Sequence, residues 1–379
     1  MKASHEEEYS TEKTLYLAFE LSQKEWKLAF SVGDGHAPRC RKLAASDLVA
    51  LGKTIARMKE RFGLAATAPV KSCYEAGLDG FWLPRCLLGQ GVANVVVDSS
   101  SIEVSRRAKH TKTDRLDAQK LVQMLIRYDR DEPYVWHVVN VPSVDAEDAR
   151  HLHRQLLSFK RDRTRYHNRI WGVLRTHGVR VDVGVKFLTD LEGARQWDGS
   201  PLPEGVVARV KREYACLQFV MAQIKELETE RRALIASGTG PVAAKVQQLL
   251  QLQGIGENGA WLLVMEFFGW REFSNRRQVG ALAGLTPTPY QSGDSYHEQG
   301  ISQAGNRHVR AMIIELAWCW LRYQPESELA QWYRRKFAKG GKREHKRGIV
   351  AVARKLLVAL WRYLETGELP VGAQLKPVT

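Results

Sequence analysis

The chain has 379 residues, of which 44% are hydrophobic, and it carries 57 Lys and Arg against 42 Asp and Glu, a formal net charge of +15. Its length predicts two or three domains with buried cores. An excess of positive charge of this size favours a polyanionic partner, because cationic side chains on a nucleic acid release condensed counterions. The sequence contains no run of about 18 apolar residues, so we expect no membrane span. Its start is polar, so we expect no signal peptide. The five scattered cysteines predict neither disulfides nor a zinc site. We therefore expect a cytoplasmic protein that does not bind a membrane.

The first third of the chain predicts a mixed α/β domain. Two β-rich runs, residues 14–21 and 26–32, are separated by a polar segment that indicates a hairpin, and a third run follows at 39–43. A helical pattern begins at Ser46 and ends near Gly63. The remaining predicted elements are a strand at 70–75, a helix at 79–88, a strand at 93–97 and a helix at 114–126. This order is that of a ribonuclease H-like fold, whose first strand, fourth strand and last helix converge on a metal site.

From about residue 145 the pattern changes to long helices. The first, residues 145–177, is rich in basic residues, and the second covers residues 205–237. The segment between them is irregular and rich in Gly and Pro, which predicts a loop at the tip of a helical hairpin or coiled coil. In the middle of the first helix only Asp162 is acidic, so nucleic-acid contact and a simply solvated face are equally good interpretations. The candidate contacts there are Arg161, Arg165 and Arg169.

Two boundaries divide the chain into three predicted domains. The first lies near residue 135, and the second lies at Gly238-Thr239-Gly240-Pro241, which combines several residues that interrupt helices. The predicted domains are an α/β domain at 1–135, a helical region for coiled-coil formation and oligomerisation at 136–240, and a mainly helical C-terminal domain at 241–379. The last of these contains an insert rich in Gly, Ser and Pro at 286–305.

Asp114 and Asp117 stand three residues apart at the start of a predicted helix, so both carboxylates can lie on one helical face. A helix cap beside a solvated charge is the simpler interpretation. In the proposed fold, however, Glu20 on the first strand and Glu75 at the end of the fourth strand would meet this pair. Four carboxylates there are suited to hold one or two divalent cations against a phosphodiester. Because every ligand is an oxygen, we expect Mg²⁺, or Mn²⁺, rather than zinc.

Several further segments are candidates for nucleic-acid contact. Residues 249–260 resemble a helix-hairpin-helix element whose turn, from Gly254 to Gly256, leaves N–H groups suited to a phosphate; an ordinary helical corner is the alternative. Ser292 lies next to a glycine in a predicted loop, where a lone Ser-Gly normally serves only as a turn. The basic segment 334–347 is expected to be flexible and to follow a nucleic-acid backbone. The other candidate contacts are Lys109, Lys112, Arg115, Arg307, Arg310, Arg343 and Lys346.

Taken together, these segments resemble the DEDD transposases of insertion sequences that encode bridge-RNA-guided serine recombinases. The resemblance covers nearly the whole chain. It rests on residues 16–22, 73–77, 112–118, the Gly-Ile-Gly turn, 284–293, 300–306 and 353–356. It implies an N-terminal RuvC-like domain, a coiled-coil region and a C-terminal transposase domain. It further implies a bacterial, nucleoid-associated enzyme.

The resemblance also implies roles for particular residues. By its position, Ser292 would be the nucleophile that attacks DNA and forms a covalent phosphoserine. Glu20, Glu75, Asp114 and Asp117 would bind Mg²⁺ beside it, in a composite site between subunits. The assembly implied is a tetramer of two dimers on donor and target duplexes, with a structured non-coding RNA that selects both by base pairing.

One residue departs from the family pattern, because the first acid is usually aspartate and this chain has Glu20. The longer side chain must fold back, and Mg²⁺ tolerates little error in its bonds of ~2.0–2.1 Å. We expect Glu20 to be a working ligand. Two alternatives stay open: a metal-dependent nuclease of the Holliday-junction-resolvase type that uses water, with Ser292 only a turn residue, and a catalytically decayed nucleic-acid-binding protein.

Overall fold

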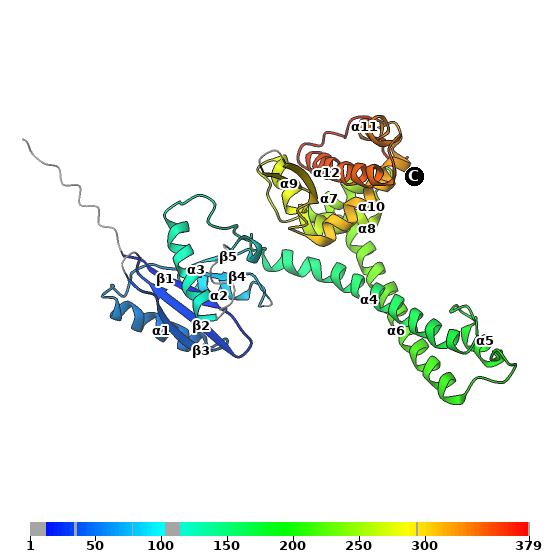
Figure 1. Ribbon diagram of the computed structural model, residues 1–379, viewed down its shortest axis with the longest axis horizontal. Coiled ribbons are helices and arrows are strands. Elements are labelled where there is room, and N and C mark those ends of the chain that lie inside the picture. The colour runs from blue at the N-terminus through cyan, green and yellow to red at the C-terminus, as the bar shows by residue number, and fades with distance from the viewer. Residues whose placement is uncertain (1–12, 34–35, 78, 103–113, 293–294, 378–379) are drawn as a thin grey trace, which may run out of the picture. The chain divides into compact units, whose positions relative to one another are not determined.

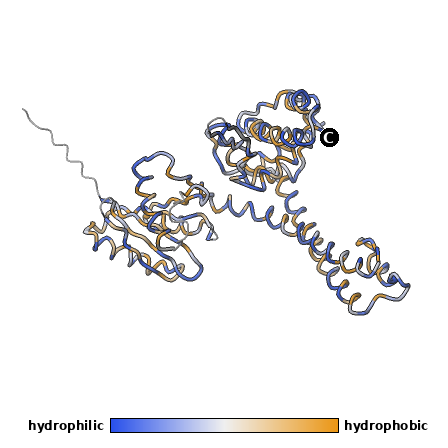
Figure 2. The backbone as a smooth tube through the Cα atoms, viewed as in Figure 1, coloured by the Kyte–Doolittle hydropathy of each residue, from blue (hydrophilic) through white to orange (hydrophobic). Residues whose placement is uncertain are grey.

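The computed structural model describes residues 13–33, 36–77, 79–102, 114–292 and 295–377. The chain divides into two compact units, an N-terminal unit of residues 1–142 and a C-terminal unit of residues 143–379 (Figure 1). Figure 2 shows hydrophobic stretches in orange in both units, on the sheet of the first and on the helices of the second. Within the described residues, no helix combines the length and the apolar content needed to cross a membrane.

The N-terminal unit is a five-stranded mixed sheet with helices. Its elements are β1 (Leu15–Glu20), β2 (Glu25–Ser31), β3 (Arg39–Ala44), α1 (Leu48–Arg61), β4 (Val70–Glu75), α2 (Trp82–Gly89), β5 (Val92–Val97), the short 3₁₀ helix η1 (Ser99–Ser101) and α3 (Asp114–Asp129). The predicted order of three strands, helix, strand, helix, strand, helix is confirmed. In space the strands run β3-β2-β1-β4-β5. The first three pair antiparallel, whereas β4 is parallel to both β1 and β5.

The two faces of this sheet bury different side chains. Successive residues of a strand point to opposite faces, so Leu17 and Phe19 pack with α1 and α2, while Ala18 packs with α3. Around Ala18 the residues facing α3 are small, and they include Ala29 and Cys73. Small side chains let the backbone of α3 lie close to the sheet.

The C-terminal unit begins with two long helices. Its elements are α4 (Val144–Thr176), α5 (Phe187–Gly193), α6 (Glu204–Ser237), α7 (Pro241–Leu250), α8 (Glu257–Leu263), the π-helix η3 (Val264–Phe268), α9 (Arg276–Leu282), β6 (Pro287–Ser292), β7 (Ser295–Ile301), α10 (Arg307–Tyr323), α11 (Glu328–Phe337) and α12 (Lys342–Thr366). Along the α4–α6 pair, Leu156 packs with Leu227, and Leu174 with Val210. The two helices are therefore antiparallel, as a helical hairpin requires (Figure 1).

The connection between α4 and α6 is more ordered than its composition predicts. It contains α5, whose Phe187 and Leu191 are buried against the helical pair. The tyrosine hydroxyl of Tyr214 on α6 donates to the carbonyl of Gly184, at 3.0 Å. Packing against the hairpin tip thus orders a segment that Gly and Pro content alone marks as irregular.

The insert at residues 286–305 forms a β-hairpin, although its Gly, Ser and Pro content predicted no strand. β6 and β7 pair antiparallel, with a register irregularity between Pro287 and Pro289. Prolines lack the N–H that a central strand needs and are tolerated only at the edge of a sheet. A two-stranded ribbon consists of edges alone, so it accommodates a composition that otherwise argues against strands.

The expectation that the basic segment 334–347 is flexible is wrong. Its second half is the first part of α12, which begins at Lys342 with Gly341 as its N-cap. The hydroxyl of Tyr333 on α11 lies 2.9 Å from Nδ1 of His345 and ties the two helices together. Lys and Arg favour helix strongly, so the charge run continues the helix rather than interrupting it.

The rest of the C-terminal unit packs around one hydrophobic core. Residues from α7, α8, η3, α10 and α12 meet there, including Trp261, Ile313 and Leu356. The predicted break between α6 and α7 is observed: Gly238 and Gly240 both have positive φ, and Pro241 is the first residue of α7. The predicted division into three domains at residues 135 and 240 stays a prediction.

Candidate functional site

Glu20 and Glu75 lie at the same end of neighbouring parallel strands. β1 and β4 pair with Phe19 opposite Tyr74, and Glu20 and Glu75 are the residues that follow. Because side chains alternate, both glutamates belong to the face of Ala18 and Cys73, which is the face that α3 covers. Glu20 is half-buried and Glu75 is exposed.

The direction of α3 follows from its contacts with these two strands. At its C-terminus, Asp129 accepts a hydrogen bond of 2.7 Å from the Tyr16 hydroxyl and pairs with the Lys71 ammonium group. Burial and the contact with Asp129 together raise the pKa of Tyr16 to about 12. Tyr16 and Lys71 lie near the starts of β1 and β4, so α3 runs antiparallel to both strands.

The N-terminal part of α3 therefore lies at the end of the sheet where the two glutamates are. The Cys73 thiol lies 3.7 Å from the Leu121 carbonyl oxygen. From Leu121 to Asp117 the helix rises ~6 Å, and from Cys73 to Glu75 the strand advances ~6.6 Å. Asp117 and Glu75 are thus at about the same level, so Asp117 lies at the end of the sheet where the two glutamates are. The side chains of Glu20, Glu75 and Asp117, all three described, do not form a group arranged to hold a metal.

Asp117 has an unusual environment. Its Oδ2 atom is buried and has no hydrogen-bond partner among the described residues. A buried carboxylate oxygen without a donor costs free energy, and a cation would remove that cost. Asp117 as a whole is half-buried, so this one oxygen, and not the entire side chain, is withdrawn from solvent. An all-oxygen set of carboxylates suits Mg²⁺ or Mn²⁺.

The complete four-acid centre stays a prediction. Asp114 is the first residue of α3, but its side chain is outside the described part of the structure, as is that of Arg115. Lys109 and Lys112 fall outside the described residues altogether. Among the side chains that are described, no three of His, Cys, Asp or Glu form a group arranged to hold a metal.

Ser292 is the last residue of β6 and pairs in register with Ser295 on β7. Its side chain lies outside the described part of the structure. The base of this hairpin is closely packed around Gly284 and Gly305, both of which also have positive φ. A Cβ atom on Gly305 would lie 2.2 Å from the Leu282 carbonyl oxygen, and one on Gly284 would lie 2.4 Å from that of Ala304.

Two further residues fix the position of the hairpin base. Arg310, a predicted nucleic-acid contact, donates to the carbonyl oxygens of Gln303, at 2.9 Å, and Ala283, at 3.3 Å. Asn306 caps α10 through the N–H groups of His308 and Val309. Arg307, the first residue of α10, is exposed.

Glu266 helps to hold Asn306 at the base of the hairpin, and no prediction from the sequence included it. Its side chain is fully buried in η3, where it accepts two hydrogen bonds from Arg154, at 2.8 and 3.0 Å, and one from Asn306, at 3.1 Å. Burial alone would raise the pKa of Glu266, but the bonds and charge of Arg154 outweigh it and hold the pKa below its usual value. The only sequence signal is a single acid within the apolar run Val264-Met265-Glu266-Phe267-Phe268.

Two of the three predicted basic contacts on α4 form ion pairs, one with an acid of α6 and one with an acid of α4 itself. Arg161, Arg165 and Arg169 are exposed. Arg169 forms a 3.0 Å ion pair with Glu213, and Arg165 pairs with Asp162 at 3.1 Å. The acidic counterweight that α4 lacks in its own sequence is therefore supplied partly by the antiparallel helix. Contact of these three arginines with nucleic acid stays a prediction.

The turn at Gly254 and Gly256 joins α7 to α8, and the C-terminal segment lies along it. Gly254 has φ +81° and packs against Cys319 and Tyr323. The Gln253 N–H donates to the Gln374 carbonyl, at 3.1 Å, and the Lys376 ammonium to the Ile255 carbonyl, at 2.8 Å. Gly256 is the N-cap of α8. The predicted phosphate contact at this turn is not tested by these interactions.

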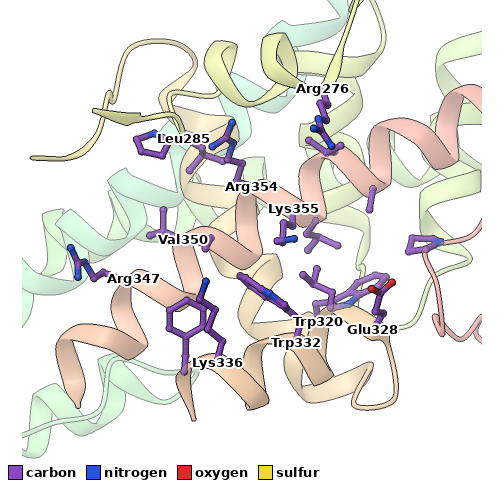
Figure 3. A pocket seen from close by; sticks show the side chains of 18 of the residues that line it. Arg276, Leu285, Trp320, Glu328, Trp332, Lys336, Arg347, Val350, Arg354 and Lys355 are labelled. Carbon is purple, nitrogen blue, oxygen red and sulfur yellow. The ribbon is translucent and has the colours of Figure 1, made fainter. Parts of the chain in front are cut away.

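A large cavity, here called the basic groove, lies in the C-terminal unit between α9, α11, α12 and the base of the β6–β7 hairpin (Figure 3). Its volume is about 1270 Å³. Two acids, Glu328 and Glu368, lie among nine basic lining residues, which are Arg276, Arg277, Lys336, Arg343, Lys346, Arg347, Arg354, Lys355 and Arg362. Arg343 and Lys346 are thus gathered with seven other basic side chains, a concentration of positive charge that suits a polyanion.

Comparison with known proteins decides the family. Residues 246–333, which include the Gly-Ile-Gly turn and the β6–β7 hairpin, match the sequence model of the Transposase IS116/IS110/IS902 family. The putative transposase y4rJ of Sinorhizobium fredii is 40% identical over 379 residues, covering 96% of this chain and 94% of that protein. The chain belongs to this transposase family.

More distant transposases align over less of the chain. The transposase for insertion sequence element IS1328 of Yersinia enterocolitica is 26% identical and covers 67% of this chain and 72% of its own length. The transposase for insertion sequence element IS1111A of Coxiella burnetii is 24% identical over 75% of this chain and 74% of its own. The similarity therefore extends well beyond the segment that the family model matches.

Proposed function

We propose that this transposase is a DNA recombinase of an insertion sequence that cuts and rejoins DNA through a covalent phosphoserine at Ser292. In this proposal the N-terminal unit is a ribonuclease H-like, RuvC-like domain. Its acids Glu20, Glu75, Asp114 and Asp117 hold Mg²⁺ or Mn²⁺. The observation that supports the proposal is that Glu20, Glu75 and Asp117 lie at one end of the sheet, in a chain of this family, and that one Asp117 oxygen is buried with no hydrogen-bond partner among the described residues.

The chemistry proposed for Ser292 conserves the number of phosphodiester bonds. The Ser292 hydroxyl loses its proton and attacks a DNA phosphorus. The bond from that phosphorus to one strand breaks, and the released strand hydroxyl takes up a proton. Attack by a hydroxyl of another strand then reverses the step and frees Ser292. A divalent cation held by the carboxylates would neutralise the phosphate charge, which lowers the barrier to attack.

The partners proposed are donor and target DNA duplexes and a structured non-coding bridge RNA, with the protein acting as a dimer that forms a tetramer on DNA. The formal charge of +15 and the basic groove support a nucleic-acid partner. The helix-hairpin-helix role of the turn at Gly254 and Gly256 belongs to the same proposal. We further propose that the protein acts at the bacterial nucleoid, where its DNA is.

The nucleophile is tested by a matched pair of serine substitutions. Ser292→Ala and Ser295→Ala remove the same hydroxyl from the two residues that pair across the end of one hairpin. With the proposed bridge RNA, target DNA and Mg²⁺, we expect wild-type protein and Ser295→Ala to form a denaturation-resistant protein–DNA adduct. Ser292→Ala should form none while it retains DNA binding.

The same assay separates the alternatives. Cleavage by Ser292→Ala without an adduct would instead identify a resolvase-type nuclease that uses water. Adduct loss in Ser295→Ala alone would transfer the nucleophile role to Ser295. Absence of divalent-metal-dependent cleavage with every bridge RNA tested would favour a decayed nucleic-acid-binding protein.

A further inference from the structure

The basic groove differs from a simple phosphate-binding surface because it contains aromatic side chains. Trp332 on α11 is half-buried and lines the cavity together with Phe337, and their rings lie 5.5 Å apart in an edge-on arrangement. The Lys355 ammonium lies 4.6 Å from the centre of the Trp332 ring, and that of Lys336 lies 6.0 Å from it. Figure 3 shows Trp332 with these two lysines, and Arg347 and Arg354 at the same cavity.

This combination decides between the two forms of nucleic acid that a basic cavity can bind. A duplex presents phosphates and the edges of its bases, while the faces of the bases are stacked on one another. An indole ring in a concave site has nothing to stack on there. In a single strand the faces are available, and proteins bind such strands with a basic groove along the backbone and aromatic rings that stack on the bases.

The size of the groove agrees with an extended ligand. A volume of about 1270 Å³ exceeds the range of ~300–1,000 Å³ that is usual for small-molecule pockets. The lining also includes Pro287, Pro289 and Gly300, which belong to the hairpin that carries Ser292. A strand held in the groove would therefore contact the base of that hairpin directly.

We propose that the basic groove binds an unpaired segment of nucleic acid, with one base stacked on Trp332 and phosphates on Lys336, Lys355 and the neighbouring arginines. The proposal rests on the proposed function, since it specifies the form of nucleic acid that the transposase takes. A melted DNA strand and a single-stranded part of an RNA share this chemistry.

Binding of labelled oligo-dT, labelled oligo-U and a duplex of equal length to the full chain tests the proposal. Stacking of one base on an aromatic ring corresponds to roughly 5- to 150-fold in affinity. We expect Trp332→Ala to weaken single-strand binding by a factor in this range and to leave duplex binding nearly unchanged. Trp332→Phe keeps a ring and should retain most of the affinity. Trp318→Ala, a tryptophan on α10 that is 51% exposed and outside the groove lining, is the matched control.

The salt dependence of binding separates stacking from charge. Trp332→Ala removes no phosphate contact, so the slope of log K against log salt should stay unchanged. Lys355→Ala should reduce the magnitude of that slope by ~0.7 for a single strand. If Trp332→Ala loses affinity for oligo-dT alone, the ligand is DNA, and if it loses affinity for oligo-U alone, the ligand is RNA. Loss of affinity for both would indicate that binding does not depend on the sugar.

Two results would overturn the proposal. Trp332→Ala could weaken duplex and single strand equally, or Trp332→Phe could lose as much as Trp332→Ala while both variants keep the wild-type melting temperature. The binding assays contain no divalent cation and need no cleavage. Failure here therefore leaves the adduct assay on Ser292 unaffected, and failure of the Ser292 assignment leaves the dependence on Trp332 intact.

Discussion

The guanidinium group of Arg154 on α4 binds both carboxylate oxygens of Glu266 on η3, at 2.8 and 3.0 Å. The arginine side chain is 49% exposed, whereas that of Glu266 is completely buried. This pair connects the first long helix of the C-terminal unit to its core. Through Asn306, which also donates to Glu266, it reaches the start of α10.

Arg154→Ala is expected to destabilise the protein strongly, because it leaves the buried Glu266 carboxylate without its main partner. Breaking a buried ion pair in this way typically costs ~3–5 kcal/mol. Urea denaturation of the full chain measures the effect. Arg165→Ala is the matched control on the same helix, since its pair with Asp162 is exposed and should contribute less than ~0.5 kcal/mol. Equal losses in the two variants would contradict the role of Glu266.

The stability of the C-terminal unit should fall on mild acidification because of His153. Its side chain is fully buried, and both ring nitrogens have no hydrogen-bond partner in the described part of the chain. Burial lowers the pKa of His153 from 6.5 to about 4, and the nearby groups are Glu266, His308, Arg231 and Arg154. Between these values the unfolded state binds a proton and the folded state does not, so stability is complete above pH 6.5 and declines as the pH falls.

The expected loss between about pH 7.5 and about pH 5 is roughly 2 kcal/mol. Denaturation midpoints across this range measure it. His153→Gln should remove this part of the slope, whereas His151→Gln, at an exposed position of the same helix, should keep it. An unchanged slope in His153→Gln would show that other groups cause the acid sensitivity.

Asp117→Asn should stabilise the metal-free protein while it removes the response to metal. The variant loses the negative charge of a buried oxygen that has no donor among the described residues, and such a group costs ~1–3 kcal/mol. In wild type, Mn²⁺ at 100 times its Kd should stabilise by about 2.7 kcal/mol. Thermal unfolding with and without Mn²⁺ measures both effects.

A matched control for this experiment is Glu60→Gln, an exposed acid on α1, which packs on the opposite face of the sheet. This variant should keep the full response to Mn²⁺. A normal metal response in Asp117→Asn would remove Asp117 from the proposed ligand set.

Gly305→Ala should distort the base of the hairpin that carries Ser292. A methyl group there would lie 2.2 Å from a backbone carbonyl, at φ +109°. Gly300→Ala isolates the contribution of backbone strain, because Gly300 has φ +97° but nothing within 4 Å of the added carbon. We expect Gly300→Ala to cost ~1–2 kcal/mol and Gly305→Ala ~1–3 kcal/mol more from the steric clash. Equal melting temperatures for the two variants would refute the close approach at Gly305.

Much of the secondary structure was predictable because it depends on local periodicity. The strand and helix order of the N-terminal unit and the two long helices follow from the spacing of apolar residues. The β6–β7 hairpin was not predictable, since Pro287 and Pro289 suppress the strand signal and only the pairing with β7 reveals it. The helix that begins at Lys342 was not predictable, because its first turns are charged and carry few apolar residues that would reveal a helical period.

The candidate site shows the same division. The residues themselves determined that Glu20 and Glu75 end strands and that Asp117 lies in the first turn of a helix, because strand ends and helix starts are local properties. That these acids share one end of the sheet is visible only in the folded chain. That depends on the direction of α3, which a contact between Tyr16 and Asp129, separated by 113 residues, reveals.

The total charge of the chain was predictable, whereas the neighbours of individual charged residues were not. The net positive charge and the membership of a transposase family follow from the amino-acid sequence alone, because charge is a property of composition and family membership of aligned residues. The sequence did not show that Glu213 would neutralise Arg169, or that Trp332 would lie among basic side chains from α9 and α12. Packing determines which distant residues become neighbours, because burial of apolar surface is non-directional and only the complete fold specifies which surfaces meet.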